Sequence, residues 1–182
     1  MAEQKKEIPS FKSNLIIFAI DVGTSNSGAC YTLPHDPERY LPGFPSKQAV
    51  TKVPTVILID RNTRKLIAFG EEAQEKYHTE DKASSKYLLF EKFKMQLHTK
   101  NQPLNSRPKV KSFCGTVEIS AVDAFGYVFQ YFRECAQKIF SENAKSYKLS
   151  DVQWVITVPA IWSDGAKQVM MEAAKQGGLT DD

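Results

Sequence analysis

Residues 15–28 read Leu-Ile-Ile-Phe-Ala-Ile-Asp-Val-Gly-Thr-Ser-Asn-Ser-Gly, an apolar run followed at once by a polar turn with two glycines. The run shows no alternation of apolar and polar residues and holds three isoleucines, which is typical of a strand covered on both faces. Residues 29–32 can supply the return strand of a hairpin. This stretch therefore predicts a hairpin at the centre of a sheet packed between helices.

Further strands follow this hairpin along the chain. Strands are predicted at residues 55–59, 66–69 and 152–158, the last of them buried, and loops at residues 34–45 and 99–111. Residues 87–97 mix aromatic residues with lysines, and their secondary structure is ambiguous from the sequence.

Two amphipathic helices are also predicted. Apolar residues recur at three- and four-residue steps along residues 120–141, with Ser120 as the N-cap, and again after Ser163 until the Gly177-Gly178 pair. Strands alternating with helices argue for an α/β protein with a mixed sheet and a small α/β insertion.

The composition excludes several classes of protein. The chain has 182 residues, a net charge of +3 and 25% charged residues, and its basic residues are scattered among acids, which argues against nucleic acid as a partner. No apolar run approaches the roughly 20 residues of a membrane helix. The 3 cysteines form neither a disulfide framework nor a zinc pair, so we expect reduced thiols in a cytoplasmic protein.

The turn at residues 21–26 is the strongest candidate for chemistry. A turn of glycine and small hydroxyl residues can direct consecutive backbone N–H groups into one anion-binding hollow. Asp21 at the end of the strand can hold a hydrated Mg²⁺, which prefers carboxylate and water oxygens. The alternative is a plain hairpin turn in which Gly23 and the polar side chains satisfy the backbone. The spacing alone leaves both interpretations open.

Other phosphate and nucleophile motifs are absent. The chain holds neither a G-x-x-x-x-G-K-[ST] nor a G-x-G-x-x-G sequence. Ser25 follows a strand and a glycine, but a serine hydrolase elbow needs G-x-S-x-G, and here the closing Gly28 lies one residue too far. Lys92 and Lys94 stand among apolar residues, either as solvated charges or as one lysine that reaches a transferred phosphoryl group.

Four segments together resemble a known family. Residues 18–25, Phe-Ala-Ile-Asp-Val-Gly-Thr-Ser, resemble the first phosphate motif of the actin, hexokinase and heat-shock protein 70 superfamily. Residues 155–160, Val-Ile-Thr-Val-Pro-Ala, resemble the strand–proline–helix segment of the heat-shock members, and residues 51–56 resemble their entry into the small subdomain. Residues 90–98 look closest to the divergent heat shock 70 kDa protein 12A/12B branch of the heat-shock protein 70 family.

The resemblance implies an actin-like ATPase (ribonuclease H-like) fold, whose two lobes are each built on a βββαβα sheet and clamp ATP and Mg²⁺ between them. It implies that Asp21 organises the Mg²⁺ shell and that Lys94, with Lys92 as its rival, is the lysine of hydrolysis. The residues that it assigns to the phosphates are Gly23, Thr24, Ser25 and Asn26.

By the same resemblance, the chain corresponds to lobe I and the second lobe is missing, as in a fragment of a longer protein. We expect a flexible N-terminus at residues 1–13, core subdomain parts at residues 14–48 and 119–182, and the small inserted subdomain at residues 49–118.

The expected function is ATP or ADP binding by a heat-shock-70-like chaperone relative in the stress response, inactive alone. Protein clients or co-chaperones would engage the missing regions. The alternatives are a non-enzymatic scaffold of the same fold, a small-metabolite kinase lobe, and a hydrolase that uses Ser25.

Overall fold

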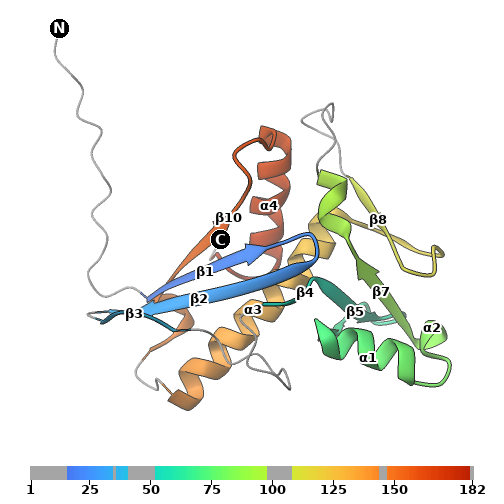
Figure 1. Cartoon of the computed structure of the whole chain (residues 1–182), viewed down its shortest axis with the longest axis horizontal. Helices are drawn as coiled ribbons and strands as arrows, with labels where there is room; N and C mark the ends of the chain where they lie inside the picture. Colours follow the sequence, from blue (N-terminus) through green and yellow to red (C-terminus); the bar gives the residue numbers. More distant parts are fainter. Residues whose placement is uncertain (1–15, 35, 41–51, 98–107, 144–146, 181–182) are drawn as a thin grey trace, which may run out of the picture.

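A computed structural model describes residues 16–34, 36–40, 52–97, 108–143 and 147–180 (Figure 1). Its elements form a main sheet with two long helices, and a smaller group of strands and helices that the chain inserts between the fourth strand of the main sheet and the first long helix. No helix within these ranges is both long enough and apolar enough to cross a membrane.

The main sheet is mixed, with the strand order β10-β1-β2-β3 and with β4 paired to β2. β1 runs antiparallel to β2 and parallel to β10. The predicted α/β class with a mixed sheet is thereby confirmed, and so is the hairpin. The strands are β1 (Ile16–Val22), β2 (Asn26–Leu33), β3 (Asp36–Tyr40), β4 (Val53–Pro54) and β10 (Val152–Thr157).

The prediction of a loop throughout residues 34–45 is wrong for β3. This strand pairs antiparallel with β2, with Leu33 opposite Asp36 and Tyr31 opposite Tyr40. β3 ends the strand order of the sheet, and an edge strand tolerates a proline such as Pro37 because one side of its backbone needs no partner. Residues 41–45 lie outside the described residues.

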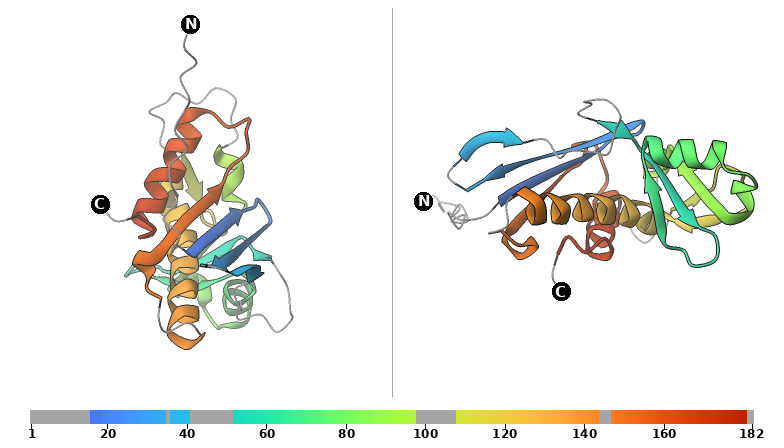
Figure 2. Two further views of the ribbon diagram at one scale, coloured as in Figure 1. Left: turned by 90° about the vertical axis from the view of Figure 1, so that its left-hand side faces the viewer. Right: turned by 90° about the horizontal axis from the view of Figure 1, so that it is seen from below.

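Two capped helices, α3 (Ala121–Asn143) and α4 (Asp164–Gln176), lie on one face of the main sheet (Figure 2). The Ser120 hydroxyl oxygen accepts a hydrogen bond from the Asp123 N–H at 3.0 Å, and the Asp123 carboxylate accepts one from the Ser120 N–H at 3.3 Å. The Ser163 hydroxyl oxygen accepts the Ala166 N–H at 3.3 Å. Both predicted caps are confirmed. Apart from the short β4 and the insertion, the elements follow the βββαβα order that the resemblance implies.

The prediction that the first strand is covered on both faces is wrong, and so is the prediction of a buried strand at residues 152–158, where half-buried and exposed residues alternate. Ile16, Phe18 and Ile20 point toward the helices and are buried, whereas Ile17 is 39% exposed and Val155 is 40% exposed. The physical reason is that α3 and α4 lie on the same side, so only alternate residues of each strand are covered by them.

The inserted elements form a three-stranded antiparallel sheet of order β6-β5-β7 and a separate hairpin of β8 and β9. The ambiguous residues 87–97 divide into a strand and a 3₁₀ helix. Residues 109–111 were predicted as loop but form a strand with Val110 buried; residues 99–107 lie outside the described residues. The elements are β5 (Val56–Asp60), β6 (Leu66–Phe69), α1 (Glu71–Thr79), α2 (Ala83–Lys86), β7 (Tyr87–Glu91), η1 (Phe93–Leu97), β8 (Lys109–Lys111) and β9 (Glu118–Ser120).

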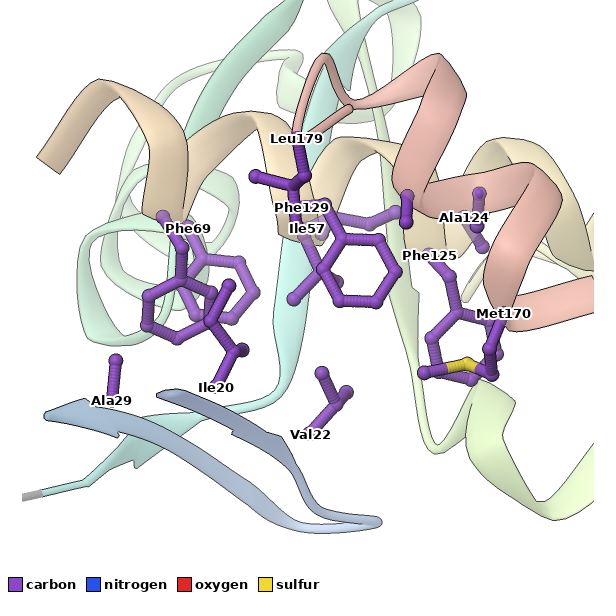
Figure 3. Packing of buried hydrophobic residues seen from close by; sticks show 14 of the residues in the cluster. Ile20, Val22, Ala29, Ile57, Phe69, Ala124, Phe125, Phe129, Met170 and Leu179 are labelled. Atoms are coloured by element: carbon purple, nitrogen blue, oxygen red, sulfur yellow. The ribbon is translucent and has the colours of Figure 1, made fainter. Parts of the chain in front are cut away.

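One apolar core joins the main sheet, the long helices and the insertion. Figure 3 shows Ile20 and Val22 of the main sheet, Ile57 of β5, and Phe125 and Phe129 of α3 within the same cluster. Burial of each phenylalanine ring contributes roughly 1.5–3 kcal/mol. The insertion is therefore held firmly against the main sheet, and its ends have fixed places beside the β1–β2 hairpin.

Candidate functional site

The candidate site lies at the tip of the β1–β2 hairpin, between Val22 and Asn26 (Figure 1). The turn is so tight that a Cβ on Gly23 would lie 2.0 Å from the carbonyl oxygen of Asn26. Only glycine permits this close approach of the backbone. Thr24 is half-buried, and Ser25 and Asn26 are exposed, so their side chains are open to a ligand.

Thr55, between β4 and β5, holds the turn from one side. Its N–H donates to the Ser25 carbonyl oxygen at 2.8 Å, and its hydroxyl donates to the Gly23 carbonyl oxygen at 2.9 Å. The same hydroxyl lies 2.7 Å from the hydroxyl of Ser27, and both side chains are buried. The C=O and N–H of a trans peptide point in opposite directions. The N–H of Thr24 is therefore directed away from Thr55.

Asp21 supplies the carboxylate of the site. It lies opposite Thr157 in the parallel register of β1 and β10, and its Oδ1 accepts the Thr157 hydroxyl at 3.0 Å. Its Oδ2 accepts a hydrogen bond from the ammonium of Lys52 at 2.9 Å. The hydrogen bond from Lys52, helped by that from Thr157, holds the pKa of Asp21 below its ordinary value against the opposing effect of partial burial. The Asp21 side chain is 47% exposed, so the charged carboxylate remains accessible.

Lys94 reaches the same place from η1. Its Nζ donates to the Val22 carbonyl oxygen at 2.5 Å and lies 5.3 Å from the centroid of a Trp162 ring. Burial lowers the pKa of Lys94, and the nearby charge of Asp21 opposes that shift. The ammonium is thus held beside the strand end that carries the carboxylate.

Lys92, the alternative to Lys94, contacts a residue outside the hairpin site. Lys92 has a left-handed backbone conformation, with φ of 54°, between β7 and η1. Its side chain is 78% exposed, and its Nζ lies 3.8 Å from a carboxylate oxygen of Glu91. Of the two lysines that the sequence singled out, Lys94 is the one whose contacts belong to the hairpin site.

The structure therefore gathers Asp21, the turn residues and Lys94 at one end of the main sheet, and adds four residues that the sequence did not single out. Thr157 could have been found from the rule that the carboxyl ends of parallel strands meet at one edge. The other three carry no signal of their own, because their places depend on tertiary packing. The additional residues are Lys52, Thr55, Thr157 and Trp162.

The donors at this site suit a metal that arrives with other ligands. The Asp21 carboxylate and the Thr157 hydroxyl are hard oxygen donors of the kind Mg²⁺ prefers. The described residues contain no group of three or more His, Cys, Asp or Glu side chains that could hold a metal ion. Since Mg²⁺ commonly keeps several waters and binds one or two carboxylates with substrate phosphates, the residues fit Mg²⁺ bound together with a nucleotide.

Curated relatives match the chain along almost its whole length. It is 42% identical over 173 residues, 91% of this chain, to the heat shock 70 kDa protein 12A of Mus musculus. It is 41% identical over 176 residues, 92% of this chain, to the Homo sapiens protein of the same name. The chain is homologous to heat shock 70 kDa protein 12A. The family resemblance drawn from the motifs is thereby confirmed.

A third relative, the heat shock 70 kDa protein 12B of Homo sapiens, is 35% identical over 178 residues, 94% of this chain. The chain spans about a quarter of the length of these relatives, 25% for the mouse 12A protein and 26% for both human proteins. Scanned against protein-family models, the chain matches none.

Two solved structures of MreB5 from Spiroplasma citri align with most of the chain. The form bound to ADP covers 92% of this chain and 36% of its own, with a TM-score of 0.44 and 12% sequence identity. The form bound to AMPPNP covers 90% of this chain and 36% of its own, with a TM-score of 0.43 and 12% identity.

Proposed function

We propose that this chain is the ATP-binding lobe of a heat-shock-70-like ATPase with an actin-like fold, and that it holds the phosphates of Mg-ATP at the tip of the β1–β2 hairpin. The observation that carries the proposal is the meeting of Asp21, Lys94 and the turn of residues 23–26 at one end of the main sheet. Homology to heat shock 70 kDa protein 12A supports the same assignment.

Each of these residues has a distinct part in the proposed site. The hydroxyls of Thr24 and Ser25 and the N–H of Thr24 donate to phosphate oxygens, as donors in anion-binding turns do. Asp21 binds the hydrated Mg²⁺ of the nucleotide, and the metal neutralises phosphate charge when bound. Thr55 positions the turn by fixing its carbonyl groups on the opposite side.

Lys94 is the proposed partner of the terminal phosphate. Its ammonium is fixed beside β1 by the Val22 carbonyl oxygen, so it meets the phosphate with little loss of side-chain freedom. A preorganised positive charge there stabilises the negative charge that develops during phosphoryl transfer. Hydrolysis needs a second lobe to cover the open site and exclude water, because electrostatic contacts weaken in bulk solvent.

Calorimetric titration of Mg-ATP into the purified chain tests this proposal. We expect saturable binding by the wild type and a loss of affinity of about tenfold or more in Lys94→Met, since a hydrogen bond to a charged group contributes about 1.5–3 kcal/mol. Lys138→Met is the matched control, because Lys138 is an exposed lysine in the last turns of α3. A wild type without saturable binding, or equal affinity in Lys94→Met, contradicts the proposal.

Turnover is a second test of the same proposal. Because the turn is exposed to water at Ser25 and Asn26, we expect this chain to hydrolyse ATP at no measurable rate in a phosphate-release assay. Turnover that Asp21→Ala abolishes would instead show a complete active site in this chain.

A further inference from the structure

Lys52 adds a second positive charge to the candidate site, beside Asp21 and Lys94. Asp21 is contacted at Oδ2 by the Lys52 ammonium at 2.9 Å, and its pKa also reflects the nearby positive charge of Lys94. One carboxylate and two ammonium groups carry a net charge of +1. A positive site attracts an anion, whereas the carboxylate alone would repel a triphosphate.

The segment that carries Lys52 is tied to the phosphate turn itself. Lys52 directly precedes β4, which pairs with β2 so that Val53 lies opposite Ser27 and Pro54 opposite Asn26. Val53 is buried in the main core. The backbone at Lys52 is therefore held next to the turn, and the lysine is placed there by the fold.

The side chain of Lys52 nevertheless keeps room to move. It is 54% exposed, and its four-carbon stem ends in a compact charge that can exchange one oxygen partner for another. An exposed ion pair of this kind contributes little to folding stability. The Lys52 ammonium can therefore leave Asp21 for a more highly charged oxygen group without disturbing the fold.

We propose that Lys52 is a phosphate-binding residue that lets this site bind nucleotide without a divalent cation. This inference rests on the proposed function. Without nucleotide, the Lys52 ammonium neutralises the Asp21 carboxylate through its contact with Oδ2. When a nucleotide binds, the ammonium donates to its phosphate oxygens, so Lys52 and Lys94 together supply two positive charges near the hairpin tip.

The test is calorimetric titration of ATP into the full chain, once in excess EDTA and once in excess MgCl₂. The wild type should bind ATP in both buffers. In EDTA, Lys52→Met should lose about tenfold or more in affinity, the loss expected for one hydrogen bond between charged groups. In MgCl₂ the loss should be smaller, because the metal then supplies positive charge to the same phosphates.

Two further variants keep the result interpretable. Lys52→Arg should retain most of the affinity in EDTA, because it keeps the charge, and Lys138→Met should match the wild type. Equal thermal unfolding midpoints of Lys52→Met and the wild type would show that the fold is intact.

Four outcomes would overturn the inference. Wild-type binding in MgCl₂ but not in EDTA would contradict it alone, and so would equal losses for Lys52→Met in the two buffers or no loss in EDTA. A wild type that binds no ATP in either buffer would contradict the proposed function as well.

Discussion

β5 of the inserted sheet is covered on both faces, whereas β1 of the main sheet is covered on one. Ile57 and Ile59 of β5 belong to the large core, and Leu58 between them belongs to a second, smaller cluster beneath α1. On β1, Phe18 is buried against the helices, but its neighbour Ile17 is 39% exposed. Two strands of similar apolar sequence thus lie in different surroundings.

The two regions contribute different parts of the candidate site. The central strand β5 of the inserted sheet is covered on both sides, while the main sheet keeps one face open and presents Asp21 at the end of its hairpin. Lys52 stands just before β4 of the main sheet, and Lys94 lies in η1, just after the inserted sheet. The pairing of β4 with β2 thus places Lys52 at the site, and the insertion delivers Lys94 to the end of β1.

Replacing one apolar side chain in each of the two strands by alanine should give the largest difference in the free energy of unfolding. Leu58→Ala removes a side chain packed on all sides and should lower the free energy of unfolding by about 2–5 kcal/mol. Ile17→Ala removes a side chain of equal size that already meets solvent, and should cost about 1 kcal/mol. Urea denaturation of the two variants measures both values. Equal losses would mean that the open face of β1 is covered in solution.

The reactivity of one cysteine in each region should also differ, as a smaller effect than the difference in stability. In the β8–β9 turn, hydrogen bonds from Ser112 and Thr116 lower the pKa of Cys114 to about 7, whereas burial raises the pKa of Cys135 on α3 to about 11. The thiolate is the reactive form. Alkylation of Cys114 should therefore rise steeply from pH 6 to about pH 8 and then level off, while Cys135 stays slow over that range.

Peptide-resolved mass spectrometry after brief treatment with iodoacetamide gives the two rates. The sign of the shift also predicts that the thiolate of Cys114 is lost as pH falls through its folded pKa, so labelling at pH 5 should be slow. Similar pH profiles for both cysteines would mean that the β8–β9 turn does not hold Cys114 in the described hydrogen bonds.

Much of this arrangement was predictable from local sequence. The hairpin, both helix caps and the phenylalanine face of α3 depend on residues near one another in the chain, and local rules describe such features well. The single-sided cover of β1 was not predictable, because it depends on which side of the sheet α3 and α4 occupy. An apolar run has the same sequence whether its second face is covered by the same chain or left open.

Some residues of the candidate site were predictable from local sequence, and others were not. Asp21 and the turn of residues 23–26 form one continuous motif, and the family resemblance pointed to Lys94 with Lys92 as its rival. Lys52 and Thr157 lie in segments that carry the family resemblance, but the sequence alone assigned them no role at the site, because each reaches Asp21 through strand pairing, over 31 and 136 residues of sequence respectively. Pairing of distant strands is decided by the packed core, and no local pattern reports it.

The central claim is that the backbone and hydroxyls at the tip of the β1–β2 hairpin receive the phosphates of ATP. The most direct measurement is a titration of ATP into the ¹⁵N-labelled chain, followed through the backbone amide signals. We predict that the amide of Thr24 shifts most, with smaller shifts at Ser25 and Asn26, and that Lys94→Met weakens the saturation of all three. Saturation that leaves these amides unmoved while shifting signals elsewhere would contradict the account.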